Sequence, residues 1–123
     1  MEQEKETYSV IGAAMAVHNE LGMGFLENVY QEALEHEFKI NKIPFEREKR
    51  ININYKDTIL QSYYIVDFVC FNNVLVEIKA SKNISGIDKS QLINYLKATK
   101  LEKGLLINFG TQKLEYKRII LDQ

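Results

Sequence analysis

The first third of the chain has the hydrophobic period of two helices. Apolar residues three and four positions apart predict one helix over about residues 7–21 and a second over about residues 26–40. Gly22 and Gly24 favour a turn between them, and Pro44 ends the second helix. The apolar positions of the two helical faces are Val10, Ile11, Ala14, Val17 and Leu21, and then Val29, Tyr30, Ala33, Leu34 and Phe38.

After Pro44 the period changes from that of a helix to that of a strand. In residues 45–55, Ile51, Ile53 and Tyr55 alternate with polar residues, which predicts a strand with one buried and one solvent-exposed face. A turn at residues 56–57 follows. Residues 60–71 and 74–80 are then predicted to pair as a hairpin, with two asparagines between them.

The remaining third adds one helix and two strands. A helix is predicted over residues 88–99, and the continuous apolar run 104–109 is typical of a buried central strand. Residues 114–121 are predicted to close an edge. The order α-α-β-β-β-α-β-β, without an internal repeat, indicates an α/β (α+β) fold, a mixed β-sheet flanked by helices, in a single domain over residues 1–123.

Charge, cysteine content and hydropathy indicate the cellular compartment of the protein better than they indicate its function. A net charge of -1 neither indicates nor excludes a nucleic-acid partner, because carboxylates at a metal site can offset a basic groove. The single Cys70 lies in an apolar run and suits a reducing compartment. No apolar stretch approaches the roughly 18 residues of a membrane span, and no signal peptide is recognisable. We therefore expect a cytoplasmic protein without membrane contact, with disorder confined to about the first five and the last few residues.

Two acids and a lysine interrupt strands that are otherwise apolar. Glu77 and Lys79 share one face of their strand because strand side chains alternate, and a hairpin can bring Asp67 to that face. Buried carboxylates are costly unless they are paired or bind a cation. With the backbone carbonyl of Ile78 and water, they would form the all-oxygen site that Mg²⁺ or Mn²⁺ prefers. The alternative, for so short a pattern, is a structural ion pair between Lys79 and one of the acids.

The spacing Asp-x₉-Glu-x-Lys on adjacent strands, followed by a helix, resembles the PD-(D/E)xK nuclease superfamily. The helix after the lysine carries Gln91 and Tyr95, four residues apart and so on one helical face. This pair is similar to the Gln-x-x-x-Tyr motif of RecB-type nucleases in the same superfamily. Its alternative interpretation is a solvent-facing glutamine beside a core tyrosine.

A third motif, Gly24-Phe25-Leu26-Glu27-Asn28-Val29-Tyr30, is similar to the signature of the GxxExxY family, which is grouped in that superfamily. Met23 departs from it where the family commonly has proline, which affects loop stiffness. Ile65 departs from it where related sequences often have arginine, which weakens the case for an extra phosphate contact there. The resemblance extends over nearly the whole chain, through residues 17–22, 77–80, 91–99 and 104–110.

The resemblance implies a restriction-endonuclease-like fold with a metal-dependent active site. It implies that Glu27 is delivered from the second helix to an Mg²⁺ or Mn²⁺ ion also bound by Asp67, Glu77 and Ile78. The alternative for Glu27 is a favourable interaction with the dipole at the start of its helix. His18 lies in the same region of the family pattern, and a positioning or structural role is favoured for it because hard cations prefer oxygen ligands.

The implied activity is hydrolysis of phosphodiester bonds in nucleic acid. Lys79 would orient the attacking water or stabilise developing charge, while Gln91 and Tyr95 would position the phosphate or the water. The full set expected to act in catalysis is Asp67, Glu77, Lys79, Gln91 and Tyr95. Candidates for contacts to the nucleic-acid backbone, or else members of an ordinary solvated helix face, are Lys82, Lys89 and Lys97.

No recognition helix, zinc finger or basic arm for reading bases is recognisable. We therefore expect a nuclease of low sequence specificity, or a structure-specific one, or one that depends on a partner. DNA is the expected substrate in preference to RNA. A homodimer or a partner protein is plausible, because one site cuts one strand. The main alternative is a catalytically silent nucleic-acid-binding or protein-interaction module on the same fold. A hydrolase or binder of small phosphorylated molecules ranks third, since the chain has no P-loop.

Overall fold

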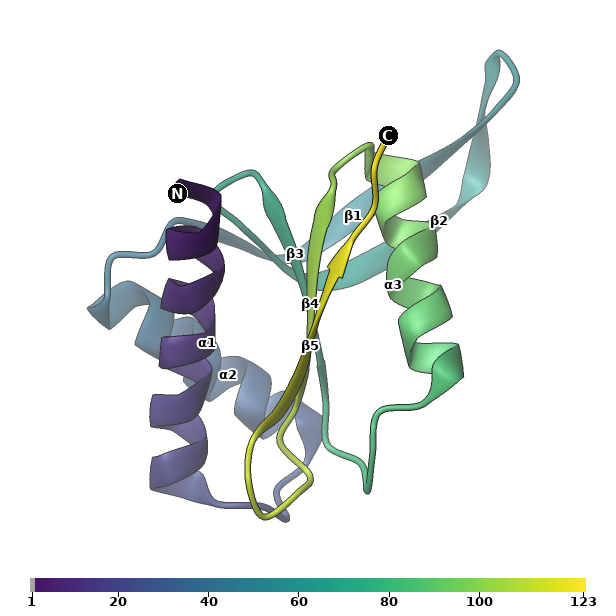
Figure 1. Cartoon of the computed structure of the whole chain (residues 1–123). Coiled ribbons are helices and arrows are strands. Elements are labelled where there is room, and N and C mark those ends of the chain that lie inside the picture. Colours follow the sequence, from purple (N-terminus) through teal and green to yellow (C-terminus); the bar gives the residue numbers. More distant parts are fainter. Residues whose placement is uncertain (1) are drawn as a thin grey trace.

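A five-stranded mixed sheet separates two layers of helix (Figure 1). The computed structural model describes residues 2–123, with side chains from residue 5 onward. The element order and the mixed, helix-flanked sheet predicted from the sequence are confirmed. The elements are α1 (Glu2–Leu21), α2 (Glu27–Ile40), β1 (Phe45–Tyr55), β2 (Thr58–Cys70), β3 (Val74–Lys79), α3 (Gly86–Thr99), β4 (Lys103–Asn108) and β5 (Glu115–Ile120).

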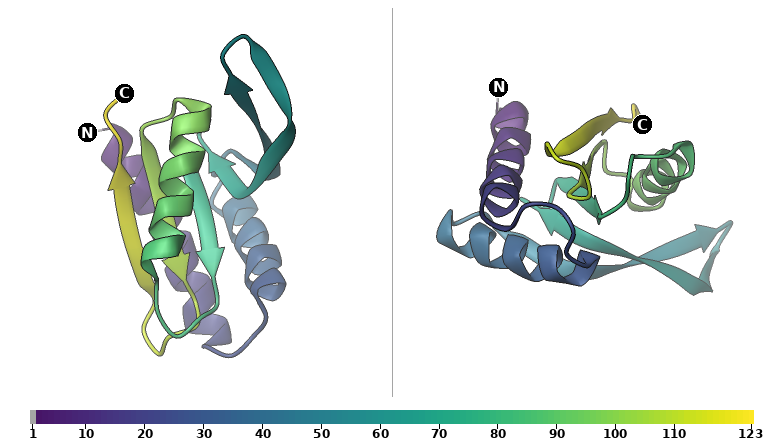
Figure 2. Two further views of the ribbon diagram at one scale, coloured as in Figure 1. Left: turned by 90° about the vertical axis from the view of Figure 1, so that its right-hand side faces the viewer. Right: turned by 90° about the horizontal axis from the view of Figure 1, so that it is seen from below.

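The strands lie side by side in chain order, β1-β2-β3-β4-β5. Strands β3 and β4 are parallel, and α3 is the crossover that connects them; the other three neighbouring pairs are antiparallel. Helices α1 and α2 cover one face of the sheet and α3 covers the other (Figures 1 and 2). This arrangement leaves the carboxyl end of β3 beside the start of α3.

Each face of the sheet has its own hydrophobic core. One core packs the sheet against α1 and α2 around Tyr30, Phe38 and Phe68, and the other packs it against α3 around Leu75 and Leu92. Strands β3 and β4 are covered on both faces, so five of the six residues in each are buried instead of every second one.

The outer part of the β1–β2 ribbon extends beyond the helices that cover the rest of the sheet (Figure 2). We call this part, residues 50–55 of β1 and 58–65 of β2, the arm. Of the three residues expected on a buried face of β1, only Ile51 is buried, and Tyr55 is 60% exposed. The prediction of a buried face is therefore wrong for the outer end of β1, because no helix covers the end of the arm.

Two helix starts differ from the sequence-based expectation. The first helix begins at Glu2, so the disorder expected over the first five residues is wrong for residues 2–5, and Met1 lies outside the described residues. Helix α3 begins at Gly86, because the Ser85 hydroxyl accepts from the Asp88 N–H while the Asp88 carboxylate accepts from the Ser85 N–H, a capping box. In the described range, no helix is both long and apolar enough to cross a membrane.

Candidate active site

The candidate site lies where strands β2 and β3 separate. Their backbone pairing ends at Phe68↔Val76 and does not continue to the next residues. Side chains take over from there: the Asp67 N–H donates to Glu77 Oε1 at 2.9 Å, and the Ile78 N–H donates to Asp67 Oδ2 at 2.8 Å. The two carboxylates therefore satisfy backbone groups that the ladder leaves unpaired, and this holds them close together.

The environment of this pair disfavours two negative charges. Glu77 is only 8% exposed, and burial, followed by the charge of Asp67, raises the pKa of Glu77 to about 8. Burial also raises the pKa of Asp67, while hydrogen bonds from the Ile78 N–H and from Glu77 oppose that rise. At neutral pH the pair therefore carries closer to one negative charge than two unless a cation compensates the second.

Lys79 follows Glu77 on the same strand and is held at the start of α3. Its Nζ lies 3.7 Å from Asp88 Oδ1, and its side chain is about one-quarter exposed. The charge of Lys79 lowers the pKa values of both Asp67 and Glu77, so it acts on the pair without being bound to either acid. Asp88 was not predicted as a site residue, although its place three residues after Ser85 identifies it as a helix cap.

A series of hydrogen bonds that begins at α2 holds Asp67, and the residues that form it were not predicted from the sequence. Gln31 Nε2 donates to Asp67 Oδ1 at 2.9 Å, and Arg47 donates through one guanidinium nitrogen to Gln31 Oε1 at 2.8 Å. The other terminal nitrogen of Arg47 contacts Glu35 at 2.7 Å. The available signal was the position of Gln31, four residues after Glu27 and hence on the same face of α2.

Glu27 reaches the site from the first turn of α2. Burial raises its pKa, the charge of Lys79 lowers it, and the charge of Asp67 raises it further, so all three groups share one electrostatic environment. The Ala80 N–H also lowers the pKa of Glu27, which places this carboxylate near the end of β3. A pocket of about 180 Å³ is lined by Glu27, Asn28, Gln31, Asp67 and Ile78.

Gln91 and Tyr95 face the sheet from α3. Tyr95 is buried, and burial together with the charges of Glu77 and Asp67 raises its pKa to about 12, opposed by a hydrogen bond with Gln91. The predicted pairing of these two residues on one helical face is therefore present, and the Tyr95 hydroxyl stays protonated near the carboxylates. Lys82 and Lys89 are not among the residues that line the pocket at these acids.

The donor set of the site fits a hard divalent cation in its chemistry. A strand residue directs its N–H and C=O toward the same edge, so the carbonyl of Ile78 faces the gap into which its N–H donates to Asp67. A cation there would offset both the burial and the repulsion by Asp67 that raise the pKa of Glu77. Among residues 5–123, however, no three acidic, histidine or cysteine side chains lie close enough together to form a ready metal site. Metal binding would therefore require the carboxylates to rearrange.

His18 lies apart from the carboxylates. Its Nε2 is 2.9 Å from the carbonyl oxygen of Thr111, and its ring is 6.2 Å from that of Phe109. These contacts connect the end of α1 to the segment that follows β4. The positioning or structural role favoured from the sequence stays a prediction.

Tyr30, the last residue of the Gly24–Tyr30 motif, holds the turn that precedes Glu27. Its hydroxyl donates to the Gly22 carbonyl at 2.5 Å and accepts from the Phe25 N–H at 3.2 Å. Its ring stacks on Phe109 at 4.6 Å. The tyrosine of the motif thus positions the backbone from which Glu27 projects.

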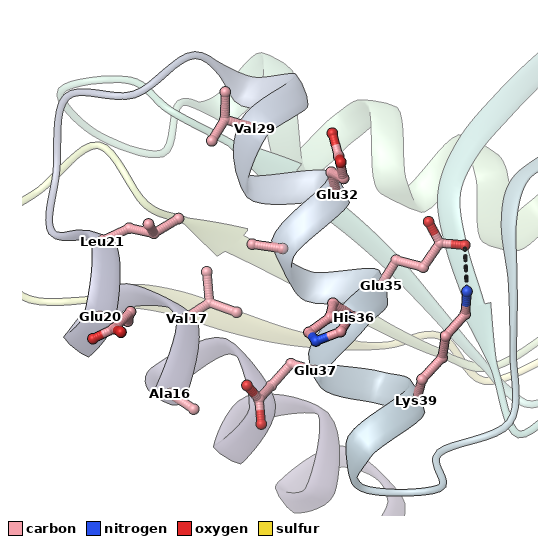
Figure 3. A pocket seen from close by; sticks show the side chains of 11 residues that line it. Ala16, Val17, Glu20, Leu21, Val29, Glu32, Glu35, His36, Glu37 and Lys39 are labelled. Atoms are coloured by element: carbon pink, nitrogen blue, oxygen red, sulfur yellow. Dashed lines mark ion pairs between the residues drawn. The ribbon is translucent and has the colours of Figure 1, made fainter.

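A larger pocket of about 730 Å³ lies between α1 and α2, outside the candidate site (Figure 3). Its polar lining is acidic, and its one lysine, Lys39, is 3.9 Å from Glu35. An acidic wall repels phosphate, so this pocket does not suit a nucleic-acid substrate. Its charged and titratable members are Glu20, Glu32, Glu35, His36, Glu37 and Lys39.

The chain resembles known proteins in both sequence and fold. Residues 4–119 match the family model described as the PD-(D/E)XK nuclease superfamily. No curated protein matches the chain. The crystal structure of SSO0001 is similar in fold, with a TM-score of 0.60 and 25% sequence identity, over 77% of this chain and 50% of that one. The matched part is thus about half the length of that protein.

Proposed function

Because this chain belongs to the PD-(D/E)XK nuclease superfamily, we propose that it is a divalent-metal-dependent nuclease that hydrolyses phosphodiester bonds, DNA more readily than RNA. The observation that carries the proposal is the pair of adjacent acids, the buried Glu77 and the partly buried Asp67, at the end of a strand ladder with Lys79 beside them. A structural ion pair would have joined Lys79 to one of these acids. Lys79 instead pairs with Asp88, which leaves both acids without a bound cationic side chain among residues 5–123.

The proposed ligands of Mg²⁺ or Mn²⁺ are the carboxylates of Asp67 and Glu77 and the carbonyl of Ile78, with Glu27 joining from α2. Such an ion, when bound, lowers the pKa of a water molecule and polarises a phosphate oxygen. The Gln31 amide fixes Asp67 through a hydrogen bond, and Arg47 fixes Gln31 in turn. These two residues are proposed to orient a ligand without contacting substrate.

Lys79 is proposed to orient the attacking water or to stabilise charge that develops on the phosphate. Its contact with Asp88, at 3.7 Å, keeps the ammonium near the end of β3 while leaving it donors to spare. Tyr95 remains a hydroxyl donor because its pKa is raised, and Gln91 orients it; both are proposed to position the phosphate or the water. All of these groups lie on rigid strands or helices, which favours preorganisation.

We propose low sequence specificity because the described helices and strands, apart from the arm, form the sheet and its two covering layers. They leave no additional element to read bases. A homodimer or a partner protein would allow both strands of a duplex to be cut, and the cytoplasm is the proposed location.

The alternative function, a catalytically silent module that binds nucleic acid or protein, is favoured by one observation. No three acidic, histidine or cysteine side chains among residues 5–123 are gathered as a ready metal site. If the side chains around Asp67 and Glu77 do not rearrange to bind a metal ion, the protein can still bind a partner through its surface but cannot hydrolyse a phosphodiester bond.

The experiment that separates the two functions is a cutting assay on single- and double-stranded DNA and RNA, with Mg²⁺, Mn²⁺ or EDTA. The wild-type protein is expected to cut DNA with either metal and not with EDTA. Replacing the lysine, Lys79→Ala, should lower cutting by about 100-fold or more, the effect of removing one transition-state donor. Thermal stabilisation by Mn²⁺ should persist in that variant.

The matched control is Lys113→Ala, an exposed lysine near the opposite edge of the sheet, which should cut like the wild type. No cutting of any substrate with either metal, together with salt-sensitive binding, would favour the silent module. Equal loss of cutting in both lysine variants would show that Lys79 acts only through net charge.

A further inference from the structure

A second surface, a groove between the arm and the C-terminal half of α3, lies next to the candidate site but is not part of it. The groove has a volume of about 380 Å³. One wall is formed by Asn54 and Tyr64 of the arm, and the other by Asn94, Lys97 and Lys100 at the end of α3. Figure 2 shows the arm rising beside this end of α3.

The charge of the groove is positive although the whole protein has a net charge of -1. Two lysines line it and no acid does. In the part of the chain with described side chains, no carboxylate forms an ion pair with Lys97 or Lys100, whereas Lys39, Lys49 and Lys79 each have an acidic partner. Both groove lysines are exposed and available to an anionic ligand.

Two tyrosine rings connect the groove to the site. Tyr64 lines the groove and is 37% exposed, and its ring centroid is 4.9 Å from that of Tyr95. Tyr95 in turn lies within the electrostatic reach of Glu77 and Asp67. Strand β2 also carries Tyr64 only three residues before Asp67. The Tyr64–Tyr95 contact therefore places the groove beside the part of α3 that faces the carboxylates.

We propose that this groove binds a single-stranded segment of nucleic acid, with phosphates at Lys97 and Lys100 and a base against Tyr64. Lysines that track a backbone and an exposed aromatic ring that stacks on a base are the combination that single-strand-binding surfaces use. Asn54 and Asn94 add donors and acceptors without demanding one base. A volume of about 380 Å³ is sufficient for one nucleotide-sized group. Stacking on Tyr64 requires a base that is not held in a duplex stack. The choice of nucleic acid as the ligand rests on the proposed function.

The arm carries two further pairs of an aromatic ring and a cation. The guanidinium of Arg50 lies 3.9 Å from the centroid of the Tyr63 ring, and the ammonium of Lys56 lies 5.5 Å from that of Tyr55 near the tip. Both rings are largely exposed. Each pair offers an aromatic ring beside a cation. Because strand side chains alternate, Tyr63 and Tyr64 point to opposite faces of the arm, so the Arg50–Tyr63 pair is a separate surface and not a continuation of the groove.

The test is binding of a fluorescein-labelled oligothymidylate to the full chain in EDTA, measured by anisotropy at several salt concentrations. The double variant Lys97→Gln/Lys100→Asn should weaken binding about tenfold or more and reduce the salt dependence by the release of about two counterions. Asparagine is chosen at position 100 because the backbone there is left-handed, with φ 65°. Tyr64→Leu should weaken binding about fivefold or more, while Tyr64→Phe should keep it.

The matched control is Lys113→Gln/Lys117→Gln, which removes the same charge from the region of the opposite edge strand. Equal weakening by both double variants would overturn the proposal, as would tighter binding of a duplex that ignores the groove substitutions. A groove variant that alters only the molar mass in light scattering would assign the groove to a second copy of the chain, and would also overturn it. If the wild-type protein binds the oligonucleotide through the groove but never cuts, only the proposed function is refuted. If the wild-type protein cuts and the groove variants bind as tightly as it does, only this inference is refuted.

Discussion

Replacing Glu77 with glutamine should stabilise the metal-free protein at alkaline pH while it abolishes cutting. The folded protein raises the pKa of Glu77 from 4.5 to about 8, so it binds this proton more tightly than the unfolded chain does. The stabilising effect of the bound proton is complete below pH 4.5 and is lost as the pH rises through about 8. Glutamine cannot ionise, and its amide oxygen can still accept from the Asp67 N–H as Glu77 Oε1 does.

The size of the effect follows from the pKa difference. Each unit corresponds to about 1.4 kcal/mol, so between pH 5 and pH 8 the wild type should lose at most about 4 kcal/mol that Glu77→Gln keeps. Part of this cost is shared with Asp67, because the two acids titrate together. For a domain of this size, the melting temperatures of the two proteins should diverge by on the order of 10 °C over that range.

The measurement is thermal unfolding by circular dichroism in EDTA at pH 5, 6, 7 and 8. Glu32→Gln, at an exposed position of α2, is the matched control and should follow the wild type at every pH. With Mn²⁺ added, the wild type should recover stability and Glu77→Gln should recover less. A melting-temperature difference that stays constant from pH 5 to pH 8 would refute the assigned environment of Glu77.

Substitutions at Gly110 and Gln31 test the residues that surround the candidate site. Gly110→Ala should destabilise the fold by about 1–3 kcal/mol, because its Cβ would lie much closer to the backbone oxygen of Ser81 than van der Waals contact allows. Gly12→Ala, in an open part of α1, should increase the free energy of unfolding by about 0.5–1 kcal/mol, and chemical denaturation measures both changes. Gln31→Leu should leave the fold intact but raise the Mg²⁺ concentration for half-maximal cutting by about 10- to 100-fold, because Asp67 loses the donor that orients it; an unchanged metal requirement would show that Gln31 has no positioning role.

Much of the fold could be predicted because its signals are local. The apolar periods of α1 and α2 and the unbroken apolar run of β4 reflect faces that are buried in the structure. The burial of the arm could not be predicted, because alternation in Ile51, Ile53 and Tyr55 describes a strand but not whether a helix covers its end. The exposure of Tyr55 depends on where α3 stops, which is a tertiary fact.

The site shows the same division between local and tertiary information. Alternation along β3 was sufficient to place Glu77 and Lys79 on one face, and spacing on α3 was sufficient to pair Gln91 with Tyr95. The contacts of Gln31 with Asp67 and of Lys79 with Asp88 join segments far apart or separated by a loop, and no short pattern specifies them. The candidate catalytic residues could therefore be proposed from the sequence, whereas the residues that contact them could not.

The end of the β2–β3 ladder explains why acids occur at this place in an apolar sheet. A continuing ladder would have paired the N–H groups of Asp67 and Ile78 with backbone carbonyls, and any acid there would have been a buried charge without a partner. Separation of the strands gives those N–H groups to carboxylates and turns the Ile78 carbonyl into the same gap. The carboxylates are thus tolerated by the fold before any metal binds, although one of them stays protonated. A metal ion would have to displace this proton and these backbone hydrogen bonds, so its affinity should be modest and should increase as the pH rises toward 8.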